Sequence, residues 1–199
     1  MFPNLFSPIK INNLEIKNRI NYPALALVYS YDRKLNDRYI NFFRERARGG
    51  AGMVTVGPVG IDFIGSGHGL LAIDSDEYIP SFSVLTKTIK DEGARAWIQL
   101  YHAGAYALPI MTGNKQAIAP SSVFNSYTRQ TPREMTIDEI KEVQEAFVRS
   151  AERAKEAGFN GVEIIGSAGY LITQFLSPLR NKRTDEYGGS FENRTRFPR

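Results

Sequence analysis

Residues 161–197 read GVEIIGSAGYLITQFLSPLRNKRTDEYGGSFENRTRF, and this stretch decides how the rest of the chain is interpreted. It begins with a short apolar run at residues 161–165, which is typical of a buried parallel strand, and the run breaks at the small residues 166–169. Tyr170 follows directly. A phenol has an unperturbed pKa of about 10, so at neutral pH it is uncharged and still holds a proton to give. The sequence therefore predicts a proton donor where a strand ends and a loop begins.

Three further strand-and-helix units precede this stretch. Strands are expected at residues 19–27, 52–56 and 94–100, and helices at residues 36–48, 78–91 and 137–157. The last helix should start at a capping box formed by Thr136 and Glu139. Ahead of all of these, two short strands at residues 9–11 and 14–16 should form a hairpin that turns at two asparagines. Strands that alternate with helices predict a parallel α/β fold, either a closed barrel or an open doubly wound sheet.

Composition and charge exclude several classes of protein. The 199 residues are 42% hydrophobic and 23% charged, which suits one substantial globular core. No apolar run approaches the roughly 18 residues that a membrane span needs, and the N-terminus lacks the pattern of a secretory signal, so we expect a cytoplasmic protein. There is no cysteine, and the two histidines lie beside no carboxylate cluster, so a metal site is not expected.

The last twenty residues are rich in basic side chains. The residues concerned are Arg180, Lys182, Arg183, Arg194, Arg196 and Arg199. No nucleic-acid motif is present among them, so neither nucleic acid nor a membrane is an expected partner. A site for a phosphate-bearing ligand is the better hypothesis for this cluster.

The opening stretch also carries a family resemblance. The residues that carry it are Gln174-Phe175-Leu176-Ser177-Pro178, Asn181, Arg183-Thr184-Asp185-Glu186-Tyr187-Gly188-Gly189-Ser190, Glu192-Asn193-Arg194 and Arg196-Phe197. This pattern resembles the Old Yellow Enzyme family of FMN-dependent NAD(P)H oxidoreductases. The resemblance implies a TIM barrel, in which the hairpin at residues 9–16 plugs the bottom and residues 161–197 run from the fourth strand to the start of the fourth helix.

A complete (β/α)8 barrel needs at least about 200 residues and usually about 250, whereas only four strand-and-helix units are expected here. We therefore expect residues 1–199 to be the N-terminal part of a single FMN-binding barrel domain that stops before strand five. In the family, the later strands carry most of the FMN phosphate site.

The resemblance also implies which residues hold the flavin. Four consecutive residues at the end of the first strand would lie against the isoalloxazine ring, namely Pro23, Ala24, Leu25 and Ala26. Gly57 would allow the same close approach from the second strand, and Gln99 would offer a donor and an acceptor to the pyrimidine edge. Plain strand packing is the alternative for Ala24 and Ala26. His102 resembles a position near the substrate pocket, against the alternative of a loop histidine bonded to backbone.

The sequence departs from the family around Tyr170. Many relatives place a His-x-x-His or His-x-x-Asn pair after the fourth strand to hold the substrate carbonyl oxygen, and here those positions are Ile165 and Ala168. The GSAGY pattern is similar to the 2,4-dienoyl-CoA reductase and 2-enoate reductase branch, in which the tyrosine is retained as proton donor. Backbone N–H groups or residues beyond Arg199 would then stabilise the oxyanion. The alternative for Tyr170 is an aromatic ring that packs over the strand with its hydroxyl on a backbone carbonyl.

The resulting hypothesis is an FMN-dependent oxidoreductase that uses NAD(P)H to reduce an activated C=C bond. Its substrate would be a small unsaturated carbonyl compound, an enoate or a (di)enoyl-CoA-type thioester, protonated by Tyr170. One alternative is a flavin-dependent amine dehydrogenase of the trimethylamine type, for which Tyr29 and Tyr31 could supply an aromatic cage. Another is a flavin-free half-barrel without activity. Assembly of several copies is left open.

Overall fold

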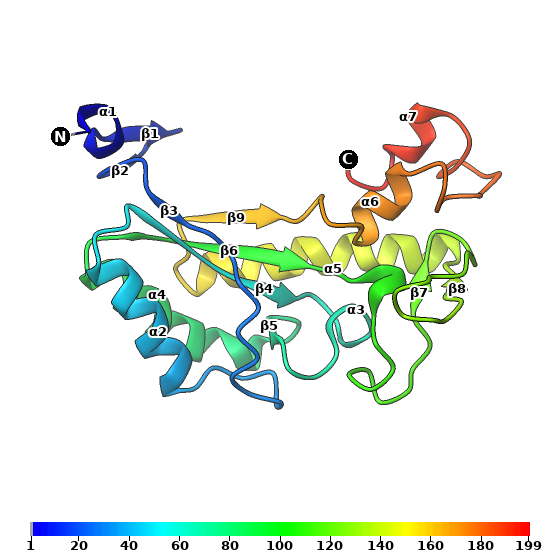
Figure 1. Ribbon diagram of the computed structural model, residues 1–199, viewed down its shortest axis with the longest axis horizontal. Helices are drawn as coiled ribbons and strands as arrows, with labels where there is room; N and C mark the ends of the chain where they lie inside the picture. Colours follow the sequence, from blue (N-terminus) through cyan, green and yellow to red (C-terminus); the bar gives the residue numbers. More distant parts are fainter. Residues whose placement is uncertain (1) are drawn as a thin grey trace.

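A parallel sheet forms the centre of the computed structural model, which describes residues 2–199. Its strands are β3 (Asn21–Tyr22), β4 (Met53–Gly60), β6 (Arg95–Tyr101) and β9 (Gly161–Ile164), paired in that order, with β5 (Leu71–Ala72) beside the end of β4. Every pairing within this sheet is parallel. The arrows of β4, β6 and β9 in Figure 1 point toward the end of the molecule where α3 and α6 lie. The carboxyl ends of the strands therefore meet at one edge.

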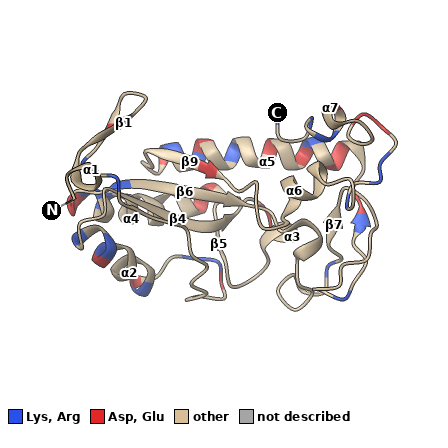
Figure 2. Ribbon diagram, turned by 45° about the horizontal axis from the view of Figure 1, so that its top comes forward, with Lys and Arg blue, Asp and Glu red and all other residues tan. Residues whose placement is uncertain are grey.

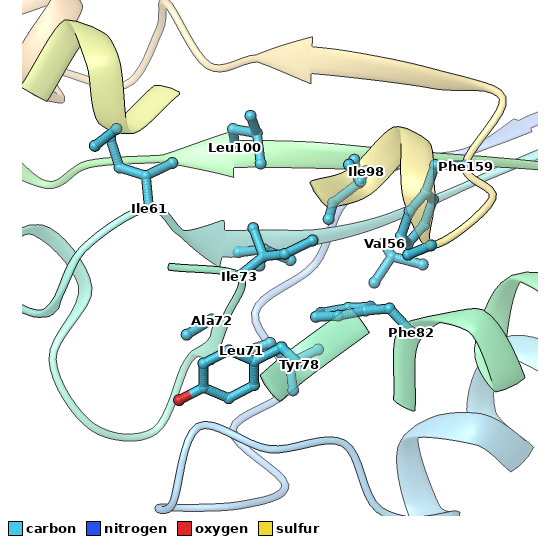
Figure 3. Packing of buried hydrophobic residues seen from close by; sticks show 14 of the residues in the cluster. Val56, Ile61, Leu71, Ala72, Ile73, Tyr78, Phe82, Ile98, Leu100 and Phe159 are labelled. Carbon is cyan, nitrogen blue, oxygen red and sulfur yellow. The ribbon is translucent and has the colours of Figure 1, made fainter. Parts of the chain in front are cut away.

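Three long helices pack on one face of this sheet: α2 (Asp37–Arg48), α4 (Ile79–Asp91) and α5 (Ile137–Glu156). Side chains alternate along a strand, so Ile98 and Leu100 enter the helix-covered core while Gln99 and Tyr101 face the opposite side. Figure 3 shows Val56, Ile98 and Phe82 together in this core, and none of the three exceeds 1% exposure. Acidic and basic residues are interspersed on the outer surfaces of α2 and α5, as Figure 2 shows.

Local capping chemistry sets where the long helices begin. The Asn36 side chain accepts a hydrogen bond from the Tyr39 N–H at the start of α2. Thr136 and Glu139 form the predicted capping box at the start of α5, each side chain accepting from the other's backbone N–H. The helix boundaries expected from the sequence are confirmed to within a residue or two.

The hairpin of β1 (Ile9–Ile11) and β2 (Leu14–Ile16) also forms as predicted, with Asn12 at a φ of 52° in its turn. It lies beyond the amino ends of the strands (Figure 1), where the Arg95 Nε donates to the Glu15 carbonyl oxygen over 2.9 Å. The N-terminus lies at this end too, beside α1 (Pro3–Phe6), and the C-terminus lies at the opposite end.

Shorter elements build the edge where the strands end. They are α3 (Phe63–Ser66), η1 (Asp76–Tyr78), η2 (Gly104–Tyr106), β7 (Ile118–Ala119), β8 (Arg133–Glu134), α6 (Leu171–Leu176) and α7 (Phe191–Arg194). The strands β7 and β8 pair with each other and fold the long segment after β6 back on itself. No helix among residues 2–199 is long and apolar enough to cross a bilayer.

Two strands differ from the prediction. The first strand was expected over residues 19–27, but regular pairing covers only Asn21–Tyr22. The strand pairs with β4 alone among residues 2–199, and Pro23 ends the pairing because it has no N–H to donate. The second strand was expected to end at residue 56, but β4 continues to Gly60 after a register shift between Val56 and Val59.

Candidate active site

The segments that follow β3, β4, β6 and β9 enclose a cavity of about 450 Å³ at the carboxyl edge of the sheet. This volume lies within the range of ligand pockets, roughly 300–1,000 Å³. Most of its wall is apolar or aromatic. The lining residues are Ala26, Val28, Ser66, Leu70, Tyr101, Ala103, Tyr106, Ala107, Leu108, Met111, Tyr127, Ala168 and Tyr170. The sequence hypothesis that chemistry gathers at the strand ends therefore has a physical space to occupy.

Tyr170 lines this cavity from the N-cap position of α6. It follows a tight turn in which Ala168 and Gly169 have φ values of 56° and 81° and the Tyr170 N–H donates to the Ser167 carbonyl oxygen. The ring is half-buried and meets the Tyr101 ring edge-on, with centroids 4.7 Å apart. Within residues 2–199, no backbone carbonyl accepts a hydrogen bond from its hydroxyl, so the purely packing alternative gains no support.

Tyr101, which meets Tyr170 edge-on, is buried at the end of β6. Burial raises the pKa of the Tyr101 phenol, and the nearby hydroxyls of Tyr170 and Tyr127 raise it further. Tyr101 therefore stays neutral across the physiological range. The Tyr170 ring thus lies in a largely apolar setting, with no charged side chain among the residues that line the cavity.

The residues expected to hold the flavin are partly brought together. Leu25 and Ala26 share a narrow crevice with Gly57, and Ala26 also lines the larger cavity with Tyr170. A Cβ on Gly57 would lie 2.9 Å from the Gln99 carbonyl oxygen, so the glycine lets β4 pass directly against Gln99. Pro23 is exposed and Ala24 is half-buried in the same irregular segment. Three strand ends thus meet around these residues.

The Gln99 side chain makes a single hydrogen bond within residues 2–199. Its Nε2 donates to Glu163 Oε1 on the neighbouring strand, where the two residues stand opposite each other. The side-chain oxygen Oε1 of Gln99 accepts no hydrogen bond from residues 2–199, so it remains free for a ligand N–H. This unused acceptor on Gln99 lies next to Gly57, which has no side chain. The pair suits a flat cofactor that presents an N–H group.

The structure places His102 inside the wall of the cavity instead of on its surface. The side chain has no exposed surface, Nδ1 accepts from the Gly104 N–H over 3.0 Å, and Nε2 lies 3.3 Å from Asp62 Oδ2. The His102 ring fills the space that a side chain at position 65 would need. A Cβ on Gly65 would lie 2.8 Å from His102 Nδ1 and nearer still to two carbons of the ring. His102 is thus bonded to backbone and is not among the residues that line the cavity, while its expected role near substrate stays a prediction.

Asp62 is a half-buried residue that sequence reasoning missed. Burial alone would raise the pKa of Asp62, but His102, the Gly65 N–H and Arg33 outweigh it and lower the pKa. The carboxylate is thus ionised and holds α3 and the loop after β6 together. His68 is exposed, with Nδ1 3.1 Å from the Tyr31 carbonyl oxygen. Residues 2–199 contain no cluster of three or more side chains suited to a metal ion.

The basic side chains near the C-terminus do not form an anion site. Arg180, Lys182, Arg194 and Arg196 each donate to a backbone carbonyl oxygen. Arg183 is buried and donates to the carbonyl oxygens of Pro120 and Met135 as well as to Asp185. These donors are engaged in shaping the loop, so the phosphate-ligand hypothesis gains no support here.

The aromatic cage considered for an amine substrate is not assembled. Tyr29 packs against Tyr39 and Phe42, with ring centroids 5.2 and 5.9 Å apart, and the Arg38 guanidinium lies 4.0 Å from its ring centroid. Tyr31 is 78% exposed. The face of Tyr29 that a substrate cation would need is already covered by an arginine.

Comparison with protein families matches residues 4–199 to the NADH:flavin oxidoreductase / NADH oxidase family. A metal reductase of Desulforamulus reducens is 48% identical over 193 residues, which are 97% of this chain and 29% of the relative. An NADPH dehydrogenase of Bacillus subtilis is 41% identical over 202 residues, which are 100% of this chain and 59% of the relative. The chain thus spans between about a third and three fifths of the length of these relatives.

Solved structures agree with these matches. A 2-naphthoyl-CoA reductase in complex with 2-naphthoyl-CoA superimposes with a TM-score of 0.94 at 36% identity, over 100% of this chain and 32% of that one. Morphinone reductase in complex with tetrahydroNAD gives a TM-score of 0.90 at 28% identity, over 98% of this chain and 58% of that one. The likeness confirms the expected fold: a parallel sheet, helices and N-terminal hairpin that match part of a TIM barrel.

Proposed function

The chain belongs to the NADH:flavin oxidoreductase / NADH oxidase family, and from this we propose that it serves the FMN-dependent reduction of an activated C=C bond by NAD(P)H. Tyr170 is the proton donor in this proposal. The observation that carries it is the position of the Tyr170 ring on a cavity that it shares with Ala26 and Tyr101, each from a different strand end. A protonated phenol there can reach a ligand bound in the same space.

The chain's own residues divide the remaining work. Ala26 and Gly57 leave room for a flat ring at the ends of the first two strands. The free side-chain oxygen Oε1 of Gln99 would accept a hydrogen bond from an N–H of that ring. FMN, when bound, supplies the hydride that NAD(P)H provides. The apolar wall, which includes Leu70, Met111 and Ala168, keeps water from the reacting carbon. The Tyr170 Oη then gives its proton to the carbon that the hydride leaves electron-rich.

An enoyl- or dienoyl-CoA-type thioester is the substrate class that we propose. At the two positions where many relatives carry side-chain donors, this chain has Ile165 and Ala168, and Ala168 lines the cavity without a donor side chain. The structural likeness to a 2-naphthoyl-CoA reductase in complex with its thioester supports the same class. The amine-oxidising alternative has no comparable support, because Arg38 covers the Tyr29 ring.

Stopped-flow kinetics of the two half-reactions test the proposal. The purified holoenzyme should absorb in the visible range like a flavoprotein. In Tyr170→Phe, reduction by NAD(P)H should keep its rate, while reoxidation by an enoyl thioester such as cinnamoyl-CoA should slow about 100- to 10,000-fold, the usual contribution of a general acid. Tyr31→Phe, at an exposed tyrosine outside the cavity, is the control and should leave both rates unchanged. Equal rates for Tyr170→Phe and wild type in both half-reactions would remove Tyr170 from the mechanism.

A further inference from the structure

Gln174 is a buried side chain that joins two of the loops around the cavity. It lies on α6, one turn after Tyr170, and is only 2% exposed. Its carboxamide makes three hydrogen bonds: Oε1 accepts from the Ala105 N–H over 2.9 Å, and Nε2 donates to the carbonyl oxygens of Ala103 over 3.0 Å and Gly169 over 2.7 Å. Both N–H groups and the oxygen are therefore used. The partners belong to the loop after β6 and to the turn that ends at Tyr170.

The backbone on both sides of this carboxamide has little room to shift. Gly104 has a φ of 61°, and a Cβ there would lie 2.8 Å from Gln174 Cδ and closer to Oε1. On the other side, a Cβ on Gly169 would lie 2.8 Å from the Tyr106 hydroxyl oxygen. The peptide that links Gly169 to Tyr170 is therefore held between Gln174 and Tyr106. The network continues to the loop after β4, because the Ala103 N–H donates to the Gly65 carbonyl oxygen over 2.8 Å.

We infer that Gln174 is a positioning residue for Tyr170: by fixing the peptide between Gly169 and Tyr170 on the loop after β6, it holds the phenol edge-on to Tyr101 and toward the cavity. The inference rests on the proposed function for its kinetic consequence only. Its structural content is that the direction of the Tyr170 ring depends on the two donated hydrogen bonds of Gln174. Without them, the Gly169 carbonyl oxygen loses its bond, and the segment keeps three backbone bonds: from the Tyr170 N–H to the Ser167 carbonyl oxygen, from the Leu171 N–H to the His102 carbonyl oxygen and from the Gln174 N–H to the Tyr170 carbonyl oxygen.

Asn181 offers a matched control in the same part of the chain. It is also buried, and its carboxamide makes the same pattern of bonds, donating to the carbonyl oxygens of Phe175 and Tyr187 and accepting from the Arg183 N–H. Its partners lie at the end of α6 and in the loop after it, and it does not line the cavity. Gln174→Glu and Asn181→Asp each replace two N–H donors by a carboxylate oxygen. The two variants therefore lose comparable bonds, but only Gln174→Glu loses bonds beside Tyr170.

The first test measures the two half-reactions in the holoenzyme. Gln174→Glu should slow reoxidation by cinnamoyl-CoA at least about 10-fold and leave reduction by NAD(P)H within about 2-fold, whereas Asn181→Asp should leave the ratio of the two rates unchanged. A purely structural role for Gln174 would instead lower both rates together, or leave their ratio as in Asn181→Asp, and either result would overturn the inference. Should Gln174→Glu fail to fold, Gln174→Met, which has a similar volume and no charge, takes its place with the same expectations.

The second test does not depend on catalysis. In protein labelled with 3-fluorotyrosine, the ¹⁹F resonance that disappears in Tyr170→Phe identifies Tyr170. That resonance should shift or split in Gln174→Glu and stay in place in Asn181→Asp. An unchanged Tyr170 resonance in both Gln174 variants would refute the positioning role. A changed resonance, combined with normal kinetics in Tyr170→Phe, would uphold the positioning and refute the proposed function instead.

Discussion

Replacing Gly65 with alanine tests how firmly the His102 ring is fixed beneath α3. The added Cβ would lie 2.8 Å from Nδ1, where ordinary contact begins at 3.4 Å, so the ring would have to retreat by about 0.6 Å or more. That movement strains the bond from the Gly104 N–H and the approach to Asp62. Overpacking costs about 1–3 kcal/mol and a buried unpaired donor about 1–3 kcal/mol, against a gain of about 0.5–1 kcal/mol for alanine over glycine in a helix. We expect a net loss of about 2–4 kcal/mol.

Urea unfolding followed by circular dichroism measures this loss. Gly166→Ala is the matched control, since its Cβ would meet Ile172 Cγ2 at 3.7 Å, an ordinary contact, and it should stay within about 0.5 kcal/mol of wild type. In a His102→Ala background the clash disappears, so Gly65→Ala should then cost nothing or stabilise slightly. A cost below about 0.5 kcal/mol in the wild-type background, or no relief in the double variant, would show that the ring is not confined as described.

Three further substitutions probe stability and its pH dependence. The pKa of Glu139 is lowered to about 2, mainly by the hydrogen bond from Arg133 and to a smaller extent by the bond from the Thr136 N–H. The ionised Glu139 therefore stabilises the fold above about pH 4.5, and this stabilisation is lost as the pH falls toward 2. Glu139→Gln should cost about 1 kcal/mol in urea unfolding at pH 7 and progressively less at pH 4 and 3. Burial raises the pKa of Tyr101, so the neutral Tyr101 phenol stabilises the fold below about pH 10, and this stabilisation is lost as the pH rises further. Between pH 9 and 11 the free energy of unfolding of Tyr101→Phe should therefore fall less than that of the wild-type protein. Arg183→Lys cannot reach two carbonyl oxygens and Asp185 together, and should lower the midpoint of thermal unfolding by an amount equivalent to about 3 kcal/mol.

The parts of the fold that the sequence predicts well are those with local causes. The capping box at Thr136 and the asparagine turn of the hairpin act within a few residues, and each appears in the structure as expected. The apolar strand runs also predict the parallel sheet. The length of the first strand could not be predicted in this way, because regular pairing depends on which partners a strand finds and not only on its own residues.

The site was predicted less completely because its contacts cross between strand ends. Gln99 pairs with Glu163 through the register of β6 and β9, which no local pattern specifies. Tyr106 reaches the cavity because the long loop is tied back by distant bonds, such as that from Asn125 Nδ2 to the Ala105 carbonyl oxygen. The glycine at position 65, which marks the burial of the His102 ring, was one of several in a glycine-rich loop and carried no distinguishing signal.

The arginines that bind carbonyl oxygens after α6 have a consequence for how this chain can vary. Exposed irregular loops usually accept replacement freely, because few contacts depend on them. Here the side chains of four arginines donate to backbone carbonyl oxygens that a helix or strand would otherwise satisfy with backbone N–H groups. These residues are Arg180, Arg183, Arg194 and Arg196. The price is that a segment which looks like surface should be as intolerant of mutation as an interior.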